Sequence, residues 1–69
     1  MKMINNFSDN LKRIREERGI SQEELAREIH TCRENVSKWE TGKISPQLRW
    51  VYAIAEVLQV NPADLVRTK

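Results

Sequence analysis

The sequence predicts an all-α protein, a compact five-helix bundle folded as a single domain over residues 1–69. Apolar residues recur at helical spacing in five segments, and no segment makes a convincing strand. Capping residues and the helix breakers Gly and Pro separate these segments. A domain of this size buries only about 60% of its unfolded surface, which favours a small helical module over an enzyme with a deep cleft. The predicted helices cover residues 8–18, 22–29, 33–41, 46–58 and 62–66.

The first two helices have clear start and stop signals. The first begins near Ser8 or Asp9, either of which accepts hydrogen bonds from free backbone N–H groups. It ends at Gly19, which readily adopts a positive φ. Ser21 and Glu24 have the spacing of a capping box at the start of the second helix. The apolar residues expected to face inward are Leu11 and Ile14, with Phe7 just ahead of them, and Leu25, Ala26 and Ile29 in the second helix.

The third helix follows the second after a very short turn, with Thr31 or Cys32 as its cap. Val36 and Trp39 share its buried face, because they are three residues apart. The small side chain of Ala26 lets another helix cross close to the second one. Two short helices in this arrangement predict a helix-turn-helix, whose second helix enters the major groove of DNA.

The last two helices are introduced by prolines. Ser45 is expected to cap the fourth helix, with Pro46 in its first turn. Asn61 and Pro62 play the same parts for the fifth. The fourth helix is expected to turn inward Leu48, Val51, Ala55 and Leu58, with Ile54 nearby. A second apolar stripe, Trp50, Ala53 and Val57, either lies half-buried against the fifth helix or the N-terminal tail, or forms a partner surface.

The outward face of the third helix is rich in hydrogen-bonding side chains. At about 100° per residue, Glu34, Ser37, Lys38 and Thr41 cluster opposite the buried pair, and Arg33 stands at the first turn. Arg and Lys suit guanine, and Glu accepts from the cytosine amino group. A net charge of +2 and a pI near 9.0 are compatible with nucleic acid. Taken alone, this helix also fits a merely solvated surface.

His30 and Cys32 are the chain's only histidine and only cysteine. They lack a third group to orient a catalytic dyad, and they supply two of the four ligands of a structural zinc. No metal or cofactor is therefore expected. A redox role for Cys32 stays open beside an incidental thiol, because a helix N-terminus favours the thiolate. The chain shows no signal-peptide pattern and no apolar run of about 20 residues, so a cytoplasmic location is expected.

Three stretches together resemble a known family: "LKRIREERGISQEELAREI", "VSKWETGKISP" and "AIAEVLQVNPADLV". They resemble the Cro/repressor-type, or XRE-like, helix-turn-helix family, and the match covers about residues 7–66. The resemblance implies a lambda repressor-like DNA-binding domain that binds operator DNA, usually as a homodimer.

The resemblance also implies roles for individual residues. Arg15 and Glu40 match a buried ion pair that ties the first helix to the end of the third; an exposed pair there would contribute little. The positions that read base edges are Arg33, Glu34, Ser37 and Lys38. The positions that contact phosphate are Gln22, Asn35, Thr41, Gly42 and Lys43.

This chain departs from the family pattern at a few turns. The family commonly has glycine at His30 and at Gln59, and both places favour the left-handed conformation. Cys32 stands where Ser or Thr usually caps the recognition helix, and Thr31 stands where a turn residue is usually apolar. The family also suggests the dimer contact, which would involve Val60, Pro62, Leu65 and Val66, although Leu65 equally fits the core.

These observations predict a sequence-specific transcriptional regulator that binds double-stranded DNA. We expect a repressor that binds a pseudo-palindromic operator as a homodimer. The alternative is an antitoxin-like or phage-like helical module whose main partner is another protein. An enzyme is not expected, because the sequence shows no acid–base pair, nucleophile–base pair or phosphate loop.

Overall fold

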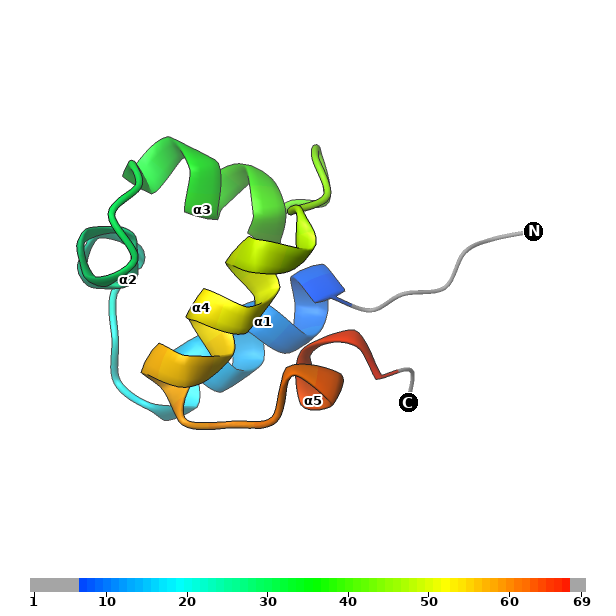
Figure 1. Ribbon diagram of the computed structural model, residues 1–69. Helices are drawn as coiled ribbons and strands as arrows, with labels where there is room; N and C mark the ends of the chain where they lie inside the picture. The colour runs from blue at the N-terminus through cyan, green and yellow to red at the C-terminus, as the bar shows by residue number, and fades with distance from the viewer. Residues whose placement is uncertain (1–6, 68–69) are drawn as a thin grey trace.

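A computed structural model describes residues 7–67, which form five α-helices and no strand (Figure 1). The all-α, five-helix prediction is confirmed, with every predicted boundary within two residues of the observed one. The helices are α1 (Phe7–Glu17), α2 (Gln22–Glu28), α3 (Arg33–Glu40), α4 (Leu48–Leu58) and α5 (Pro62–Val66).

The arrangement leaves one side of α3 uncovered. In Figure 1, α3 runs along the upper edge, α2 is seen end-on beside it, and α4 crosses in front of α1. The short α5 lies on the side away from α2 and packs on α1 and α4. Because α2 and α1 both pack against α3 from within, they form the support that fixes its orientation.

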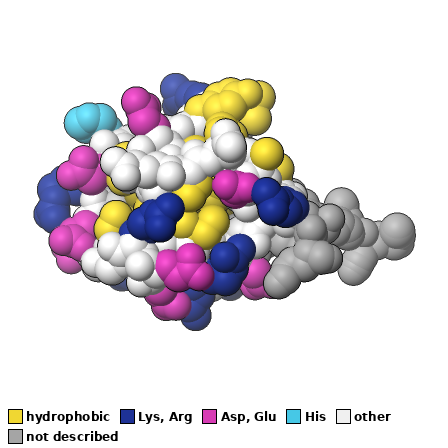
Figure 2. Space-filling view, turned by 90° about the horizontal axis from the view of Figure 1, so that it is seen from below, with side chains coloured by type: hydrophobic (Ala, Val, Ile, Leu, Met, Phe, Trp, Pro, Cys, Tyr) yellow, Lys and Arg dark blue, Asp and Glu magenta, His cyan; other side chains and the backbone are white. Residues whose placement is uncertain are grey.

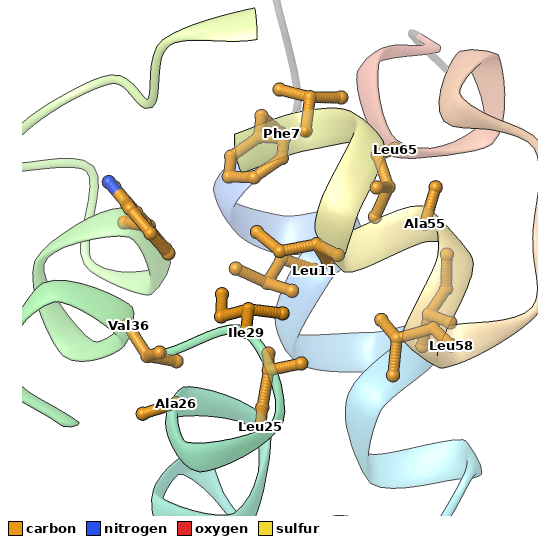
Figure 3. Packing of buried hydrophobic residues seen from close by; sticks show 13 residues of the cluster. Phe7, Leu11, Leu25, Ala26, Ile29, Val36, Ala55, Leu58 and Leu65 are labelled. Carbon is orange, nitrogen blue, oxygen red and sulfur yellow. The ribbon is translucent and has the colours of Figure 1, made fainter. Parts of the chain in front are cut away.

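All five helices contribute to one hydrophobic core (Figure 3). Val36 and Trp39 of α3 are 0% and 2% exposed, and Ala26 of α2 is 2% exposed, so the helix-turn-helix packs as predicted. Burial of each large apolar side chain contributes about 1.5–3 kcal/mol. The buried apolar residues are Phe7, Leu11, Ile14, Leu25, Ala26, Ile29, Val36, Trp39, Val51, Ile54, Ala55, Leu58 and Leu65.

The predicted starts of α1 and α4 are wrong in detail. Helix α1 already begins at Phe7, so Ser8 and Asp9 lie inside its first turn. Helix α4 begins at Leu48 after an extended Gln47, which leaves Ser45 and Pro46 in the preceding loop.

Leu48 was expected in the core and is instead 64% exposed. Helical side chains tilt toward the N-terminus of their helix. Leu48 occupies the first position of α4, so its side chain leans beyond the start of the helix, whereas Val51, one turn later, is 6% exposed.

Residues 7–67 contain four helix ends of one type. A residue with positive φ follows the last turn, and the next N–H donates back into the helix, as in the Schellman motif. After α2, for example, the N–H of His30 donates to Arg27 O at 3.2 Å and that of Thr31 to Ala26 O at 2.8 Å. The four positive φ angles are Gly19 72°, His30 64°, Gly42 78° and Gln59 61°. The left-handed prediction at His30 and Gln59 is confirmed.

His30→Gly is expected to raise the free energy of unfolding by about 0.5–1 kcal/mol. A left-handed non-glycine residue is strained by about 1–2 kcal/mol, and the extra freedom of glycine in the unfolded chain offsets part of that gain. His30 is exposed, so no packing is lost. Thermal unfolding checks the result, since each kcal/mol moves Tm by about 4–8 °C.

Gly19→Ala is the matched control for this prediction. A Cβ built at Gly19 meets no atom within 4 Å, so its effect comes from the backbone angle alone. We expect Gly19→Ala to lower Tm. A lower Tm for His30→Gly would contradict the assignment of strain to this turn.

Trp50 is half-buried, as one of the two predictions had it, but with a different neighbour. Its ring packs on Trp39 of α3, with centroids 5.6 Å apart and planes tilted by 44°. The guanidinium of Arg49 lies 5.0 Å from the Trp50 ring centroid, in a cation–π position. Ala53 and Val57 also pack on the core, so this stripe is not a bare partner surface. The N-terminal tail, the other predicted neighbour, lies outside the described residues.

A buried amide that sequence reasoning missed fixes α5 to α1. Asn10 is 2% exposed, and its Nδ2 donates to Leu65 O at 3.0 Å and to Arg67 O at 2.9 Å. Its Oδ1 accepts from Arg13 NH2 at 3.1 Å. A helix of five residues has little stability of its own, so these bonds hold α5 where Leu65 fills the core.

Candidate nucleic-acid interface

The outward face of α3 is organised as the sequence predicted. Arg33, Glu34 and Lys38 are exposed, and Asn35 and Ser37 are half-buried at its edges. Val36 and Trp39 anchor the opposite face, so neither cation is turned into the protein body. The face of the molecule opposite α3, shown in Figure 2, mixes acidic with basic side chains. That mixture suits solvent better than a polyanion, whereas α3 carries the hydrogen-bonding set.

Arg15 and Glu40 form a buried ion pair beneath α3. The distances are 2.5 Å from Arg15 Nε to Glu40 Oε2 and 3.1 Å from NH2 to Oε1, and the side chains are 9% and 3% exposed. Arg15 NH1 also donates to Ile20 O at 2.7 Å. The hydrogen bond to Glu40 raises the pKa of Arg15 and outweighs the opposite effect of burial. The pair fixes the end of α3 to α1 and to the turn before α2.

Gln22 connects this buried pair to the exposed face. Its Nε2 donates to Glu40 Oε1 at 2.9 Å, and its Oε1 accepts a longer bond from Arg33 NH1 at 3.4 Å. A carboxylate only accepts hydrogen bonds, so the amide nitrogen of Gln22 must face Glu40 and the amide oxygen must face outward. The sequence predicted Gln22 as a phosphate contact and did not predict this link, because 18 positions separate Gln22 from Glu40.

The loop after α3 is closed by its own backbone. The N–H of Gly42 donates to Trp39 O at 3.3 Å and that of Lys43 to Lys38 O at 2.9 Å. Thr41 Oγ1 donates to Lys38 O at 3.3 Å. A phosphate grip through the N–H groups of Gly42 and Lys43 therefore requires these bonds to open, while the exposed Lys43 side chain keeps its charge available.

Helix α2 begins with a strong cap and helix α3 with a weak one. Ser21 and Glu24 form the predicted capping box, and the N–H and hydroxyl of Ser21 lower the pKa of Glu24. Cys32 is the exposed N-cap of α3 and makes no side-chain cap bond. Asn35 Nδ2 donates to Thr31 Oγ1 at 2.8 Å. This bond uses one donor of the Asn35 side-chain amide, which the sequence predicted to contact phosphate.

The residues predicted for a dimer contact differ in accessibility. Leu65 is 0% exposed, so it has no surface to offer a partner and belongs to the core. Val60 and Pro62 are half-buried, and Val60 packs on the core. Val66 is 42% exposed. Of this set, Val66 is the residue with substantial free surface.

The described part of the chain carries neither a membrane span nor a metal cluster. None of its helices is long and apolar enough to cross a bilayer. Within residues 7–67, His, Cys, Asp and Glu form no group of three or more that could hold a metal ion.

Comparison with known proteins decides the family. Residues 11–65 match the helix-turn-helix family, which covers most of the chain and spans all of α2, α3 and α4. The chain belongs to the Cro/repressor (XRE) type of helix-turn-helix proteins. Domains of this family bind double-stranded DNA, and the protein is a transcriptional regulator with a helix-turn-helix DNA-binding domain.

Two similar proteins are described as transcriptional regulators. An HTH-type transcriptional regulator from Archaeoglobus fulgidus is 45% identical over 56 residues, which cover 77% of this chain and 80% of that protein. The HTH-type transcriptional activator BcrR from Enterococcus faecalis is 30% identical over 60 residues. That match covers 87% of this chain but only 29% of BcrR, so the likeness concerns one part of the activator.

Solved structures show the same fold in different settings. The restriction-modification controller protein C.AhdI from Aeromonas hydrophila has a TM-score of 0.82 at 30% identity, covering 86% of both chains. The P22 c2 repressor, solved with a synthetic operator, has a TM-score of 0.84 at 21% identity, which shows the fold alone. The hydroxypropylphosphonic acid epoxidase from S. wedmorenis matches at 29% identity and a TM-score of 0.82 over 32% of its chain. The likeness to that enzyme is thus limited to its helix-turn-helix-like part.

Proposed function

We propose that this Cro/repressor-type protein is a sequence-specific repressor that binds a pseudo-palindromic operator as a homodimer in the cytoplasm. The supporting observation is the exposure of Arg33 and Lys38 on a recognition helix that Val36 and Trp39 anchor from behind. Two such helices about 34 Å apart read successive major grooves on one face of DNA. Repression is the simplest action for such a domain, because a protein bound at a promoter excludes polymerase from it.

Base reading falls to the exposed α3 face in this proposal. Arg33 and Lys38 donate to guanine, Glu34 accepts from cytosine, and Ser37 contacts either. Gln22 holds Arg33 through its amide oxygen before DNA arrives, which lowers the entropy lost on binding.

Phosphate contacts set the register in this proposal. Lys43 supplies the charge, and neutral hydrogen-bonding groups come from Gln22, Asn35, Thr41 and Gly42. These four residues now form hydrogen bonds within the protein, which they exchange for bonds to phosphate or share with it on binding.

Lys38→Ala is expected to weaken binding to the preferred site by about 1–3 kcal/mol and to relax the preference at one base pair. Lys43→Ala is the matched control, an exposed lysine of the same type on the adjoining loop. It should weaken all DNA sequences alike and reduce the salt dependence by about one phosphate contact. Competition binding against random DNA measures both. Equal losses on preferred and random DNA for Lys38→Ala would remove it from the base-reading set.

Selection of bound sites from a random duplex pool, repeated at two salt concentrations, tests the proposed function as a whole. We expect a two-fold symmetric consensus whose half-sites lie one helical turn apart. A promoter reporter carrying that site should lose expression when the protein is present. An asymmetric consensus, or none, would contradict the proposal; a stable protein partner purified in its place would favour the alternative of an interaction module.

A further inference from the structure

A groove that the proposed DNA contacts do not use lies between α1, α5 and the turn that joins α4 to α5. We call it the α1–α5 groove. In Figure 1, α5 and this turn lie on the side of the molecule opposite α3. The groove has a volume of about 510 Å³. Sites for small molecules usually have about 300–1,000 Å³, so the α1–α5 groove is large enough to hold one.

The α1–α5 groove has a preformed apolar floor. Ile14 of α1 is 5% exposed, and Val60 in the turn before α5 is half-buried and packs on the core. Beside them, Asn10 is 2% exposed and holds the backbone of α5 through its Nδ2. These contacts already fix α1 and α5 relative to each other. An apolar group that enters the groove therefore meets Ile14 and Val60 without a rearrangement of the fold.

Two arginines in the groove are oriented by neutral acceptors. Arg18 Nε donates to the backbone oxygen of Leu58, the last residue of α4, at 2.7 Å. Arg13 NH2 donates to Asn10 Oδ1 at 3.1 Å. A neutral acceptor orients a guanidinium group but leaves its charge uncompensated. In the described part of the chain Arg18 forms no ion pair, and the pair of Arg13 with Glu17 is exposed and long, at 3.7 Å.

The charges in the groove favour a ligand with a single negative charge. Three arginines, Arg13, Arg18 and Arg67, and two acids, Glu17 and Asp64, line it, which leaves a net charge of +1. Asp64 is bound to Arg67, so the surplus lies with Arg13 and Arg18. A guanidinium group binds a carboxylate through two parallel hydrogen bonds. A dianion such as phosphate would keep an unbalanced negative charge beside both acids.

We propose that the α1–α5 groove binds a small monocarboxylate that carries an apolar group. The carboxylate accepts from the guanidinium groups of Arg13 and Arg18, and the apolar group covers Ile14 and Val60. Because both arginines are already oriented, less entropy is lost when the ligand binds. No residue of α3 lines the groove, so the carboxylate and DNA can occupy the protein together. The inference goes beyond the proposed function and does not depend on it.

Titration of the isotope-labelled full chain with hexanoate, followed by NMR, tests this site. We expect saturable shifts of the Arg18 Nε–H signal and of the Val60 amide, with a Kd of about 1–10 mM for so small a ligand. The signals of the exposed α3 residues should stay unchanged. Hexanamide has the same apolar group without the charge, and inorganic phosphate has the charge without the apolar group. Both should bind at least about 10-fold more weakly than hexanoate.

Arg18→Gln and Lys12→Gln are the matched variants. Each removes one positive charge from an exposed side chain at or beside α1, but Lys12 does not line the groove. Arg18→Gln should weaken hexanoate binding at least about 10-fold, and Lys12→Gln should change it less than about 2-fold. Because Arg18→Gln also loses the bond to Leu58 O, Glu17→Gln gives a second test with Arg18 intact. Removal of this competing carboxylate should strengthen binding about 2–5-fold.

Each outcome bears on the groove independently of DNA binding. Saturable shifts confined to the groove, which Arg18→Gln removes and Glu17→Gln strengthens, support the site even if the chain shows no preference among DNA sequences. No saturable shift up to about 100 mM hexanoate overturns it, as does weaker binding by Glu17→Gln. Equal binding of hexanamide would show an apolar contact alone, and equal binding of phosphate an adventitious ion only. Equal losses in Arg18→Gln and Lys12→Gln would show unspecific attraction by charge, and all three results contradict the proposal.

Discussion

Glu40→Ala is expected to destabilise the fold by about 3–5 kcal/mol, which is the cost of removing one partner from a buried ion pair. The variant leaves Arg15, only 9% exposed, with a full positive charge, one hydrogen bond to Ile20 O and a longer ion pair of 3.9 Å with the exposed Glu16. It also removes the acceptor of Gln22. A total stability of about 5–15 kcal/mol for a small domain means that this change removes much of it. Urea unfolding measures the loss.

Two controls isolate the buried charge from other effects. Arg13 and Glu17 form an exposed pair on α1 at 3.7 Å, with side chains 51% and 57% exposed. Glu17→Ala leaves the bond from Arg13 to Asn10 in place, so it should cost less than about 1 kcal/mol. Replacing both partners, as Arg15→Met with Glu40→Leu, should recover much of the loss because no unpaired charge remains. A Glu40→Ala loss as small as that of Glu17→Ala would mean that water reaches the buried pair of Arg15 and Glu40.

The same carboxylate joins stability to the proposed DNA contacts. Glu40 orients the amide of Gln22, and the amide oxygen of Gln22 accepts from Arg33. The hydrogen bonds thus connect Arg15 of α1 to Glu40 at the C-terminal end of α3. From Glu40 they continue through Gln22, at the start of α2, to Arg33 in the exposed first turn of α3. In such a network a change at the buried end alters the geometry at the exposed end, even without contact to DNA.

Local signals predicted most of the helices, and tertiary contacts explain where they failed. The capping box at Ser21 and the left-handed turns at His30 and Gln59 depend on neighbouring residues, and the structure has all three. Ser45 and Pro46 carry an equally strong start signal, yet Pro46 is half-buried in the loop before α4. Such a packing contact, invisible in a local pattern, is able to override the signal.

In the candidate site, too, local patterns predicted some features and missed those that depend on tertiary contacts. The exposure of Arg33 and Lys38 follows from helical periodicity once Val36 and Trp39 are recognised as core. The bonds between Gln22 and Glu40, and those from Asn10 to the end of α5, join residues 18 and more than 50 positions apart. No spacing rule predicts such pairs, because loop lengths and helix packing together decide which polar groups meet.

Leu65→Ala is expected to destabilise the fold by about 2–5 kcal/mol, the range for truncating a buried leucine. Leu65 is 0% exposed where α5 packs on α1 and α4, and Asn10 holds the backbone of α5, so the site cannot easily collapse onto the cavity. The family-based prediction of Leu65 as a dimer contact gives a different result: the loss would shrink as the protein is diluted and the dimer dissociates. Thermal unfolding over a wide range of protein concentration separates the two.

Val66→Ala serves as the comparison for Leu65→Ala, since Val66 directly follows Leu65 and is 42% exposed. In the monomer it should cost less than about 0.5 kcal/mol, as for most surface substitutions. In the dimer it should lower Tm only where the wild type associates. A concentration-independent loss for Leu65→Ala beside a concentration-dependent one for Val66→Ala places adjacent residues of one short helix in two roles, core and interface. A concentration-dependent loss for Leu65→Ala would instead show that α5 opens to reach a partner.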